Sequence, residues 1–439
     1  MSEADLVELD RELVKFISPL ISGLGRVERC EALGWYACGL LLAGGRKSIA
    51  PMAARLCPEP SEADAMRQRL QQAVVVARWN EHEVSRRLRQ RMEQEMSELG
   101  GLEADVCDDT GLPKRGPHSV GVARQYSGTL GRVEQCQVVV SLHSAGPLGS
   151  YCHGMRLYLP EPWAQDWQRR AQVGVPESIA FATKWQLVLD LLDRATAEGK
   201  PKRPLVADAG YGDVAQFRRE LNQRQIPYVV EVMSTTAVWA PGTGPEPPPT
   251  APTGARGRPR TVYRDGEHRP LSVTELVLSQ TPEALQTVSW QNLGAPERHS
   301  RFGALRVQPA AGHCQGQPPE PEQWLLWEWP EGQELPEHYW LSTVPQDTPL
   351  ERLVYLTKLR WRVERDYQEL KEEVGLDHYE GRTWAGLHHH LVLCTVAHSF
   401  LMLQRAKWHR AAESAAPSAT KSQPSQRKKR PATLETATV

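Results

Sequence analysis

The segment from Arg360 to Lys371 carries an arginine, a glutamate and a lysine at spacings of four and seven residues. With 3.6 residues per turn, the side chains of Arg360, Glu364 and Lys371 fall within about 40° of one another on a helix. A separate apolar stripe follows the same helical spacing: Leu356, Leu359, Val363, Leu370 and Val374. The pattern predicts a helix on which Glu364 lies at the edge of a buried face, between two cations.

A carboxylate in that position can bind a metal ion while the flanking cations hold a polyanion. The same spacings also occur on helices that only face solvent. A metal site is therefore indicated only if other elements of the chain supply further carboxylates.

The length of 439 residues is enough for two or three domains, each with its own core. A hydrophobic content of 40% and a charged content of 24% are typical of a soluble globular protein. The eight cysteines form no pair with zinc-site spacing, which favours free thiols in a reducing compartment. No secretion signal or long apolar run is present, so we expect a cytoplasmic protein without a membrane contact.

Four changes in composition and apolar spacing divide the chain into five segments. Residues 1–100 show helical spacing, including a long run over 63–96, and predict a helical N-terminal domain. Over 101–238, short apolar strands alternate with helix-like runs, which favours a mixed α/β sheet. Residues 239–345 start as a Pro-rich linker and continue as a β-rich insertion, and helices are expected again over 346–408. The basic tail, 409–439, is expected to be disordered.

Acidic residues close two of the expected strands. Asp108 and Asp109 end the first, and Asp208 ends another before a glycine-containing turn. Cleavage of phosphodiester bonds commonly uses two divalent ions about 4 Å apart, held by carboxylates. Because neighbouring residues of a strand point to opposite faces, only one of the two adjacent aspartates can join a site with Asp208 and Glu364.

Three blocks of the sequence carry a resemblance to a known family. They are Asp108–Gly116 with the following Ser119–Gly128, then Ala207–Gly212, and then the helix of Glu364 with Gly375–Trp384 behind it. Over about residues 30–405 the chain resembles bacterial insertion-sequence transposases of the DDE class. Within that class it is similar to the group marked by a Tyr-x2-Arg-x3-Glu-x6-Lys helix, except that Thr357 occupies the tyrosine position.

The resemblance implies an RNase H-like α/β fold, in which a mixed sheet core is interrupted by the β-rich insertion and an α-helical N-terminal domain binds DNA. It implies cut-and-paste transposition, with metal-dependent cleavage at the element ends and strand transfer into target DNA. The expected cofactor is Mg²⁺ or Mn²⁺. The expected partners are terminal inverted repeats and target DNA, bound by a homodimer beside the bacterial nucleoid.

The resemblance also implies roles for individual residues. The catalytic acids of the family hold the metal ions, which assigns Asp109, Asp208 and Glu364 to this role. Asp109 is preferred because the family pattern places a threonine directly after the ligand, and Asp108 stays as the alternative. Contacts to the DNA backbone are expected for Arg360 and Lys371.

Other basic residues allow two interpretations of their role. Lys114 and Arg115 follow the first acids and either contact DNA near the cut or are simply solvated. Arg256 and Arg258 lie in an Arg-Gly-Arg-Pro element, which fits a DNA minor groove but also a solvated linker.

Two rival functions stay open. One is a catalytically inactive, transposase-derived DNA-binding protein, an idea favoured by the departure at Thr357. The other is a hydrolase that acts on sugars through a pair of carboxylates and needs no metal.

Overall fold

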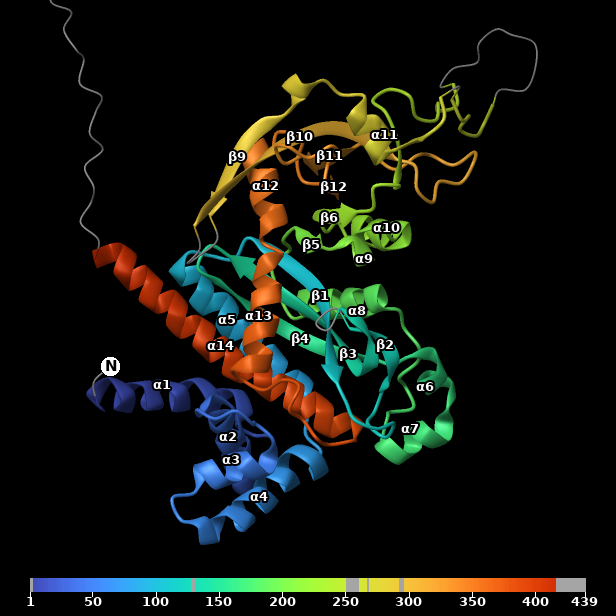
Figure 1. The fold of residues 1–439 in the computed structure, drawn as a ribbon. Helices are drawn as coiled ribbons and strands as arrows, with labels where there is room; N and C mark the ends of the chain where they lie inside the picture. Colours follow the sequence, from blue (N-terminus) through green and yellow to red (C-terminus); the bar gives the residue numbers. More distant parts are fainter. Residues whose placement is uncertain (1–2, 128–130, 250–259, 267, 292–295, 416–439) are drawn as a thin grey trace, which may run out of the picture.

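Figure 1 shows the fold of the chain in a computed structural model. The structure describes residues 3–127, 131–249, 260–266, 268–291 and 296–415. The described chain combines a helical N-terminal part with a large mixed sheet and further helices, which confirms the predicted fold class.

The N-terminal part contains helices α1 (Glu3–Ile21), α2 (Val27–Leu41), α3 (Ile49–Leu56), α4 (Ala63–Gln71) and α5 (Glu81–Leu99). The end of α1 is held by Arg87 of α5, which donates hydrogen bonds to the carbonyl oxygens of Leu20 (3.2 Å) and Ser22 (2.6 Å). A cation on the last carbonyls of a helix offsets the negative end of its dipole. This contact ties the first helix to the last helix of the N-terminal part.

The helical run expected over 63–96 is interrupted. After α4, a π-helical turn Gln72–Val76 leads into an extended segment, and α5 follows. The consecutive valines of the turn are stiff at χ1 and have a lower helix propensity. The indole of Trp79 closes the turn by donating a hydrogen bond to the carbonyl oxygen of Ala73 (3.0 Å).

The sheet in the described part of the chain has twelve strands. They are β1 (Ala104–Pro113), β2 (Ala123–Ser127), β3 (Arg132–Gly146), β4 (Gly149–Tyr158), β5 (Leu205–Ala207), β6 (Tyr228–Val232), β7 (Ala237–Trp239), β8 (Leu271–Ser272), β9 (Gln286–Gln291), β10 (Glu297–Pro309), β11 (Gln323–Glu328) and β12 (His338–Ser342). The remaining helices are α6 (Glu161–Gln165), α7 (Trp167–Val173), α8 (Lys184–Ala197), α9 (Ala209–Gly212), α10 (Ala215–Gln223), α11 (Val273–Leu278), α12 (Leu350–Lys358), α13 (Trp361–Glu372) and α14 (Trp384–Ala415).

The centre of the sheet is mixed. Strands β4, β3, β1, β5 and β6 lie in that order, with β3 antiparallel to β1 and β4, and with β5 parallel to both β1 and β6. One face packs against α13, α14 and the N-terminal helices, and the other packs against α8, α9 and α10. This arrangement is consistent with an RNase H-like core.

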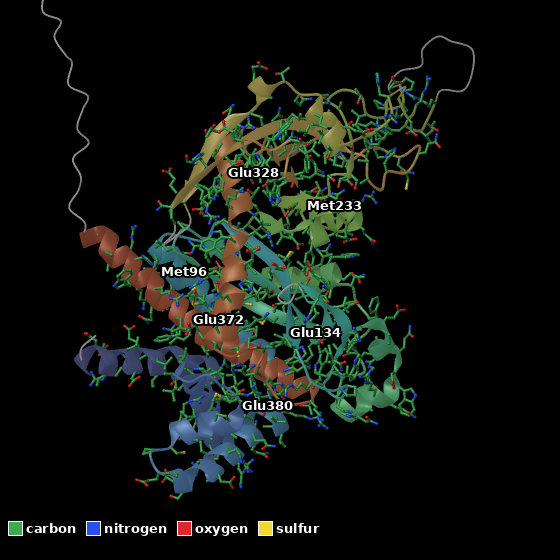
Figure 2. All side chains as sticks on the ribbon, viewed as in Figure 1. Met96, Glu134, Met233, Glu328, Glu372 and Glu380 are labelled. Carbon is green, nitrogen blue, oxygen red and sulfur yellow. The ribbon has the colours of Figure 1, made fainter. Side chains whose placement is uncertain are left out.

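The β-rich segment extends the core sheet. Strand β12 pairs antiparallel with β6, so that Leu341 lies opposite Val230, and β11 and β10 follow. Without β12, the polar backbone of β6 would form an exposed sheet edge. Lys358 of α12 pairs with the buried Glu328 of β11 (2.7 Å), labelled in Figure 2, and this contact joins the segment to the C-terminal helices.

The C-terminal helices bury the predicted apolar stripe. Leu356, Leu359, Val363, Leu370 and Val374 are each at most 4% exposed. Helix α14 continues to Ala415, so 409–415 is helical rather than part of a tail, and 416–439 lie outside the described residues. Within the described chain, α14 is the one helix long and apolar enough to cross a membrane, but 94% of its most apolar window is buried in the protein, as in a core helix.

Gly212, at the end of α9, offers a test of this packing. A Cβ added there would lie 2.0 Å from the carbonyl oxygen of Glu231 and 2.8 Å from the Cβ of Val230. We expect Gly212→Ala to lower the free energy of unfolding by about 1–3 kcal/mol, measured by urea denaturation, because the backbones of α9 and β6 have to separate. The control is Gly45→Ala, whose Cβ would meet no atom within 4 Å. Equal stability of the two variants would contradict the close approach.

Candidate active site

Asp108 and Asp208 lie side by side on neighbouring parallel strands. Strand β1 does not end at Asp109, as the sequence predicts, but continues to Pro113, so Asp108 lies inside it, whereas Asp208 directly follows the end of β5. Val106 of β1 pairs with Val206 of β5, and each aspartate is two residues further along its strand. Side chains two residues apart on a strand share a face. The two carboxylates therefore point to the face that carries α13. Asp208 also caps α9, because it accepts a hydrogen bond from the backbone N–H of Tyr211 (3.3 Å).

Helix α13 brings a cation and the third acid to this face. Arg360 immediately precedes the helix, and its guanidinium reaches Asp108 Oδ2 (3.5 Å) and Glu364 Oε1 (2.6 Å). The side chain of Glu364 is 55% exposed, whereas that of Asp108 is only 14% exposed. Arg360 and Glu364 thus lie next to each other, as predicted, and Glu364 lies on the solvent-exposed side of the site.

The two aspartates disfavour each other's charge. Burial, followed by the charge of Asp208, raises the pKa of Asp108 to about 7, although Arg360 opposes the shift. Burial also raises the pKa of Asp208. The charge of Arg360 lowers this pKa, and the charge of Asp109 raises it further. A cation placed between the carboxylates would relieve this repulsion.

The donor set fits a divalent metal ion, although it is not arranged around one point. Buried carboxylate oxygens are the ligands that Mg²⁺ and Mn²⁺ favour. Among the described residues, no group of three or more His, Cys, Asp or Glu side chains has the geometry to hold a metal ion. The guanidinium of Arg360 links Asp108 to Glu364 and partly offsets their negative charge.

Asp109 points to the opposite face of β1. Its carboxylate pairs with Lys184 at the start of α8 (2.8 Å) and accepts a hydrogen bond from the hydroxyl of Tyr211 (3.1 Å). The sequence prefers Asp109 as the metal ligand, whereas this geometry favours the alternative, Asp108. The physical reason is the parallel register of β1 and β5, which sets Asp108 beside Asp208.

The expected DNA-contacting residues are found in different surroundings. Lys114 donates hydrogen bonds to the carbonyl oxygens of Tyr379 (2.5 Å) and Asp377 (3.4 Å), and burial lowers its pKa to about 8. It therefore holds the loop before α14. Burial also lowers the pKa of Lys371, opposed by the nearby Asp377. Arg115 is exposed.

Three further expectations concern the linker and the tyrosine position. Arg256 and Arg258 lie outside the described residues. Thr357, at the tyrosine position of the pattern, is buried and donates a hydrogen bond to the carbonyl oxygen of Val354 (2.7 Å). Its side chain is used inside the fold and does not face a substrate.

A buried polar network, missed by the sequence reasoning, fixes α13 to the sheet. The hydroxyl of Tyr367 donates to the main-chain oxygen of Asp108 (3.0 Å) and also bonds Ser141 (2.6 Å). Ser141 in turn bonds His143 (2.8 Å), which pairs with Asp366 (2.8 Å). The signal in the sequence was the presence of polar residues on the apolar side of a predicted helix, next to Val363 and Leu370.

The surroundings of His143 and Asp366 favour the ionised form of both side chains. Burial disfavours a charge on His143, but Cys152 and the Asp366 carboxylate outweigh it and raise the pKa of His143 to about 10. The pKa of Asp366 is lowered, because His143 and His398 overcome the effect of burial. Helix α13 is therefore attached to β3 by an ion pair as well as by apolar contacts.

This pair predicts a loss of stability at high pH. Above pH 6.5, the ordinary value for histidine, the folded state keeps a proton on His143 that the unfolded state releases. The free energy of unfolding should therefore fall by on the order of 3 kcal/mol as the pH rises from neutral through about 10. Urea denaturation at several pH values measures this slope. The variant His143→Gln should be less stable at neutral pH and have a flatter slope; an unchanged slope would rule out the charged pair.

The comparison with known protein families gives one match. A family model described as DDE superfamily endonuclease matches residues 19–297, more than half of the chain. The matched region contains the aspartates of β1 and β5, whereas Glu364 lies beyond it. No curated protein matches the chain.

Proposed function

The chain belongs to the DDE superfamily of endonucleases, and from that premise we propose that it is a transposase. It would cut DNA at the ends of a mobile element and join the freed 3′ ends to a target site. The observation that carries this proposal is the meeting of Asp108, Asp208 and the Arg360–Glu364 pair on one face of the sheet.

Asp108, Asp208 and Glu364 would hold the divalent ions. When bound, Mg²⁺ or Mn²⁺ supplies an activated water or 3′-hydroxyl and stabilises the leaving oxygen. Asp108 and Asp208 are mostly buried, and their mutual repulsion favours binding of a cation. Glu364 is paired with Arg360, so binding of a metal by all three acids requires the two side chains to exchange partners.

Arg360 would then act on the DNA. Its guanidinium is a fixed positive charge on the side of the site where Glu364 is exposed. A guanidinium released from a carboxylate offers two parallel donors to the oxygens of a phosphate. We assign it to the backbone next to the scissile bond, together with the exposed Arg115.

Transposition is favoured over simple cleavage by the three sequence blocks in their order along the chain. Joining two ends requires two active sites, which supports a homodimer in the DNA-bound state. The terminal inverted repeats, the target DNA and a location beside the bacterial nucleoid belong to the same proposal. The competing possibility, an inactive DNA-binding relative, is favoured by Thr357, which is buried where the family pattern has a tyrosine.

Substitution of the acids tests catalysis. We expect Asp208→Asn and Glu364→Gln each to reduce cleavage of element-end DNA more than about a hundredfold, since loss of a metal ligand exceeds the effect of losing a supporting residue. Binding of the same DNA, followed by gel shift without divalent metal, should persist. Chelation should abolish the activity of the parent and added Mg²⁺ should restore it. Firm binding without any cleavage by the parent would favour the inactive relative.

A second experiment separates the two adjacent aspartates. Asp108→Asn should abolish cleavage, whereas Asp109→Asn should retain more of it because Asp109 faces Lys184 and Tyr211. Binding of Mn²⁺, measured by calorimetry, should weaken in the first variant and change little in the second. Loss of Mn²⁺ binding in Asp109→Asn alone would return the assignment to Asp109.

A further inference from the structure

A groove separates the N-terminal helices from the α7 side of the molecule. One part of it, of about 950 Å³, is lined by Arg78 and Trp79 of the N-terminal part, by Trp167 and by Trp384. A second part, of about 690 Å³, lies among Arg26, Arg29 and Arg69. Both parts are lined by the interrupted segment 72–79, so we treat them as one surface, the Trp167 groove.

The residues of this groove come from segments far apart in the sequence. The wall formed by Arg78 and Trp79 belongs to the N-terminal helices, Trp167 begins α7, and Trp384 begins α14. Figure 1 shows α2, α3, α4 and α7 at the end of the molecule away from the strands β9 to β12. The groove contains none of the three acids of the candidate active site.

Arginines dominate the charge of the groove. Arg26, Arg69 and Arg78 are exposed, and Arg29 is half-buried, where it donates hydrogen bonds to the carbonyl oxygens of Leu24 (2.9 Å) and Arg78 (3.4 Å). Three glutamates also line the groove: Glu28, Glu81 and Glu177. Glu81 lies against His82 (3.5 Å), and the part of the groove around Arg69 has three arginines and a single glutamate. The part that contains Trp167 is balanced, with two arginines and two glutamates, so the excess of positive charge lies around Arg69. The two parts meet where Arg29 donates its hydrogen bond to the carbonyl oxygen of Arg78.

Apolar and aromatic groups lie open to solvent beside these cations. Trp167 is 73% exposed and Val76, on the opposite wall, is 58% exposed. Trp79 stacks on His389 with ring centroids 3.9 Å apart, which fixes the wall behind them. An exposed indole beside arginines offers a flat apolar face on which a planar group can stack.

Trp167 stands on a rigid support. Asp166 caps α7 by accepting a hydrogen bond from the backbone N–H of Arg169 (2.9 Å). Arg170 donates hydrogen bonds to the carbonyl oxygens of Ala164 (2.9 Å) and Ile179 (2.6 Å), which joins the segments on both sides of the helix. The backbone that carries Trp167 is therefore held in place before any partner arrives, so little backbone entropy is lost on binding.

We propose that the Trp167 groove binds a DNA strand with unpaired bases, with its phosphates on the arginines and a base stacked on Trp167. The arginines complement the charge of a nucleic-acid backbone. An exposed indole can stack on an unpaired base, whereas the bases of an intact duplex already stack on one another. The proposal rests on the proposed function only in taking DNA as the partner, and it adds a second DNA site away from the catalytic acids.

The first test measures binding of oligothymidine to the full chain by fluorescence anisotropy, without divalent metal. Trp167→Ala should weaken binding about tenfold or more, and Trp167→Phe should restore most of it, because one stacked base contributes an effect of this size. The matched control, Trp408→Ala, removes a tryptophan that is 67% exposed on α14 and should leave binding unchanged. Affinity of Trp167→Ala within twofold of the parent overturns the proposal.

The second test measures the salt dependence of the same binding. Removing two phosphate contacts with Arg69→Ala/Arg78→Ala should make the negative slope of log K against log salt less steep by about 1.4, as expected for a single strand. The control, Arg11→Ala/Arg269→Ala, removes two exposed arginines outside the groove and should preserve the slope. An equal slope in both double variants overturns the role of the arginines.

A comparison of single-stranded with duplex DNA tests which form of DNA the groove binds. Trp167→Ala should weaken binding of oligothymidine more than binding of its duplex with oligodeoxyadenosine. An equal loss on both forms overturns base stacking as the mode of binding. Because these measurements need neither metal nor cleavage, a failure of the transposase proposal, seen as intact metal-free binding without catalysis, is distinguishable from a failure at this groove.

Discussion

The attachment of α13 to β1 is the contact on which the candidate site depends. Tyr367 donates a hydrogen bond from the helix to the main-chain oxygen of Asp108, and Ser141 and the charged His143–Asp366 pair continue this contact into the sheet. A buried ion pair does little for net stability unless its partners are well satisfied, but it allows few alternative arrangements. Here it fixes how far α13 can slide or turn against the sheet, and so it fixes where Glu364 meets the strand ends.

The electrostatics of the site follow from that placement. Two carboxylates from parallel strands are buried side by side, which raises the pKa of Asp108 to about 7. Arg360 is the neighbouring cation and divides its guanidinium between Asp108 and Glu364. In the proposed function this site would hold divalent ions, and the partner exchange of Arg360 would make a phosphate-binding group available at the same moment. Metal binding and DNA engagement are coupled in this proposal by one side chain.

The strands that extend the sheet also hold the helices of the candidate site. Because β12 pairs with β6 and Glu328 of β11 holds Lys358, the β-rich segment is rigidly joined to α12, directly before Arg360. The groove with Trp167 lies at the other end, where the N-terminal helices meet α7 and α14. The two proposed DNA contacts therefore rest on different parts of one continuous core.

Much of the fold and of the candidate site could be predicted from the sequence, because these features depend on local periodicity. The apolar stripe through Val363, the helical N-terminal region and the strand end before Asp208 all follow from spacing, and the family of the chain follows from ordered blocks. The strand end expected at Asp109 was wrong, because pairing with β3 carries β1 on to Pro113. The break before α5 was missed because tertiary contacts of Trp79 override a helical pattern. For Lys114 the sequence offered a DNA contact or a solvated side chain, and the structure instead buries it against the main-chain oxygen of Tyr379.

By itself, then, the sequence determined most of the helices and strands and the acids that they carry. Only the tertiary structure decided which of two adjacent aspartates faces α13. The physical reason is that a strand alternates its side chains between two faces, and the faces become different only when neighbours pack on them. The register of β5 and the hydroxyl of Tyr367 supply that difference for Asp108, while Lys184 supplies it for Asp109.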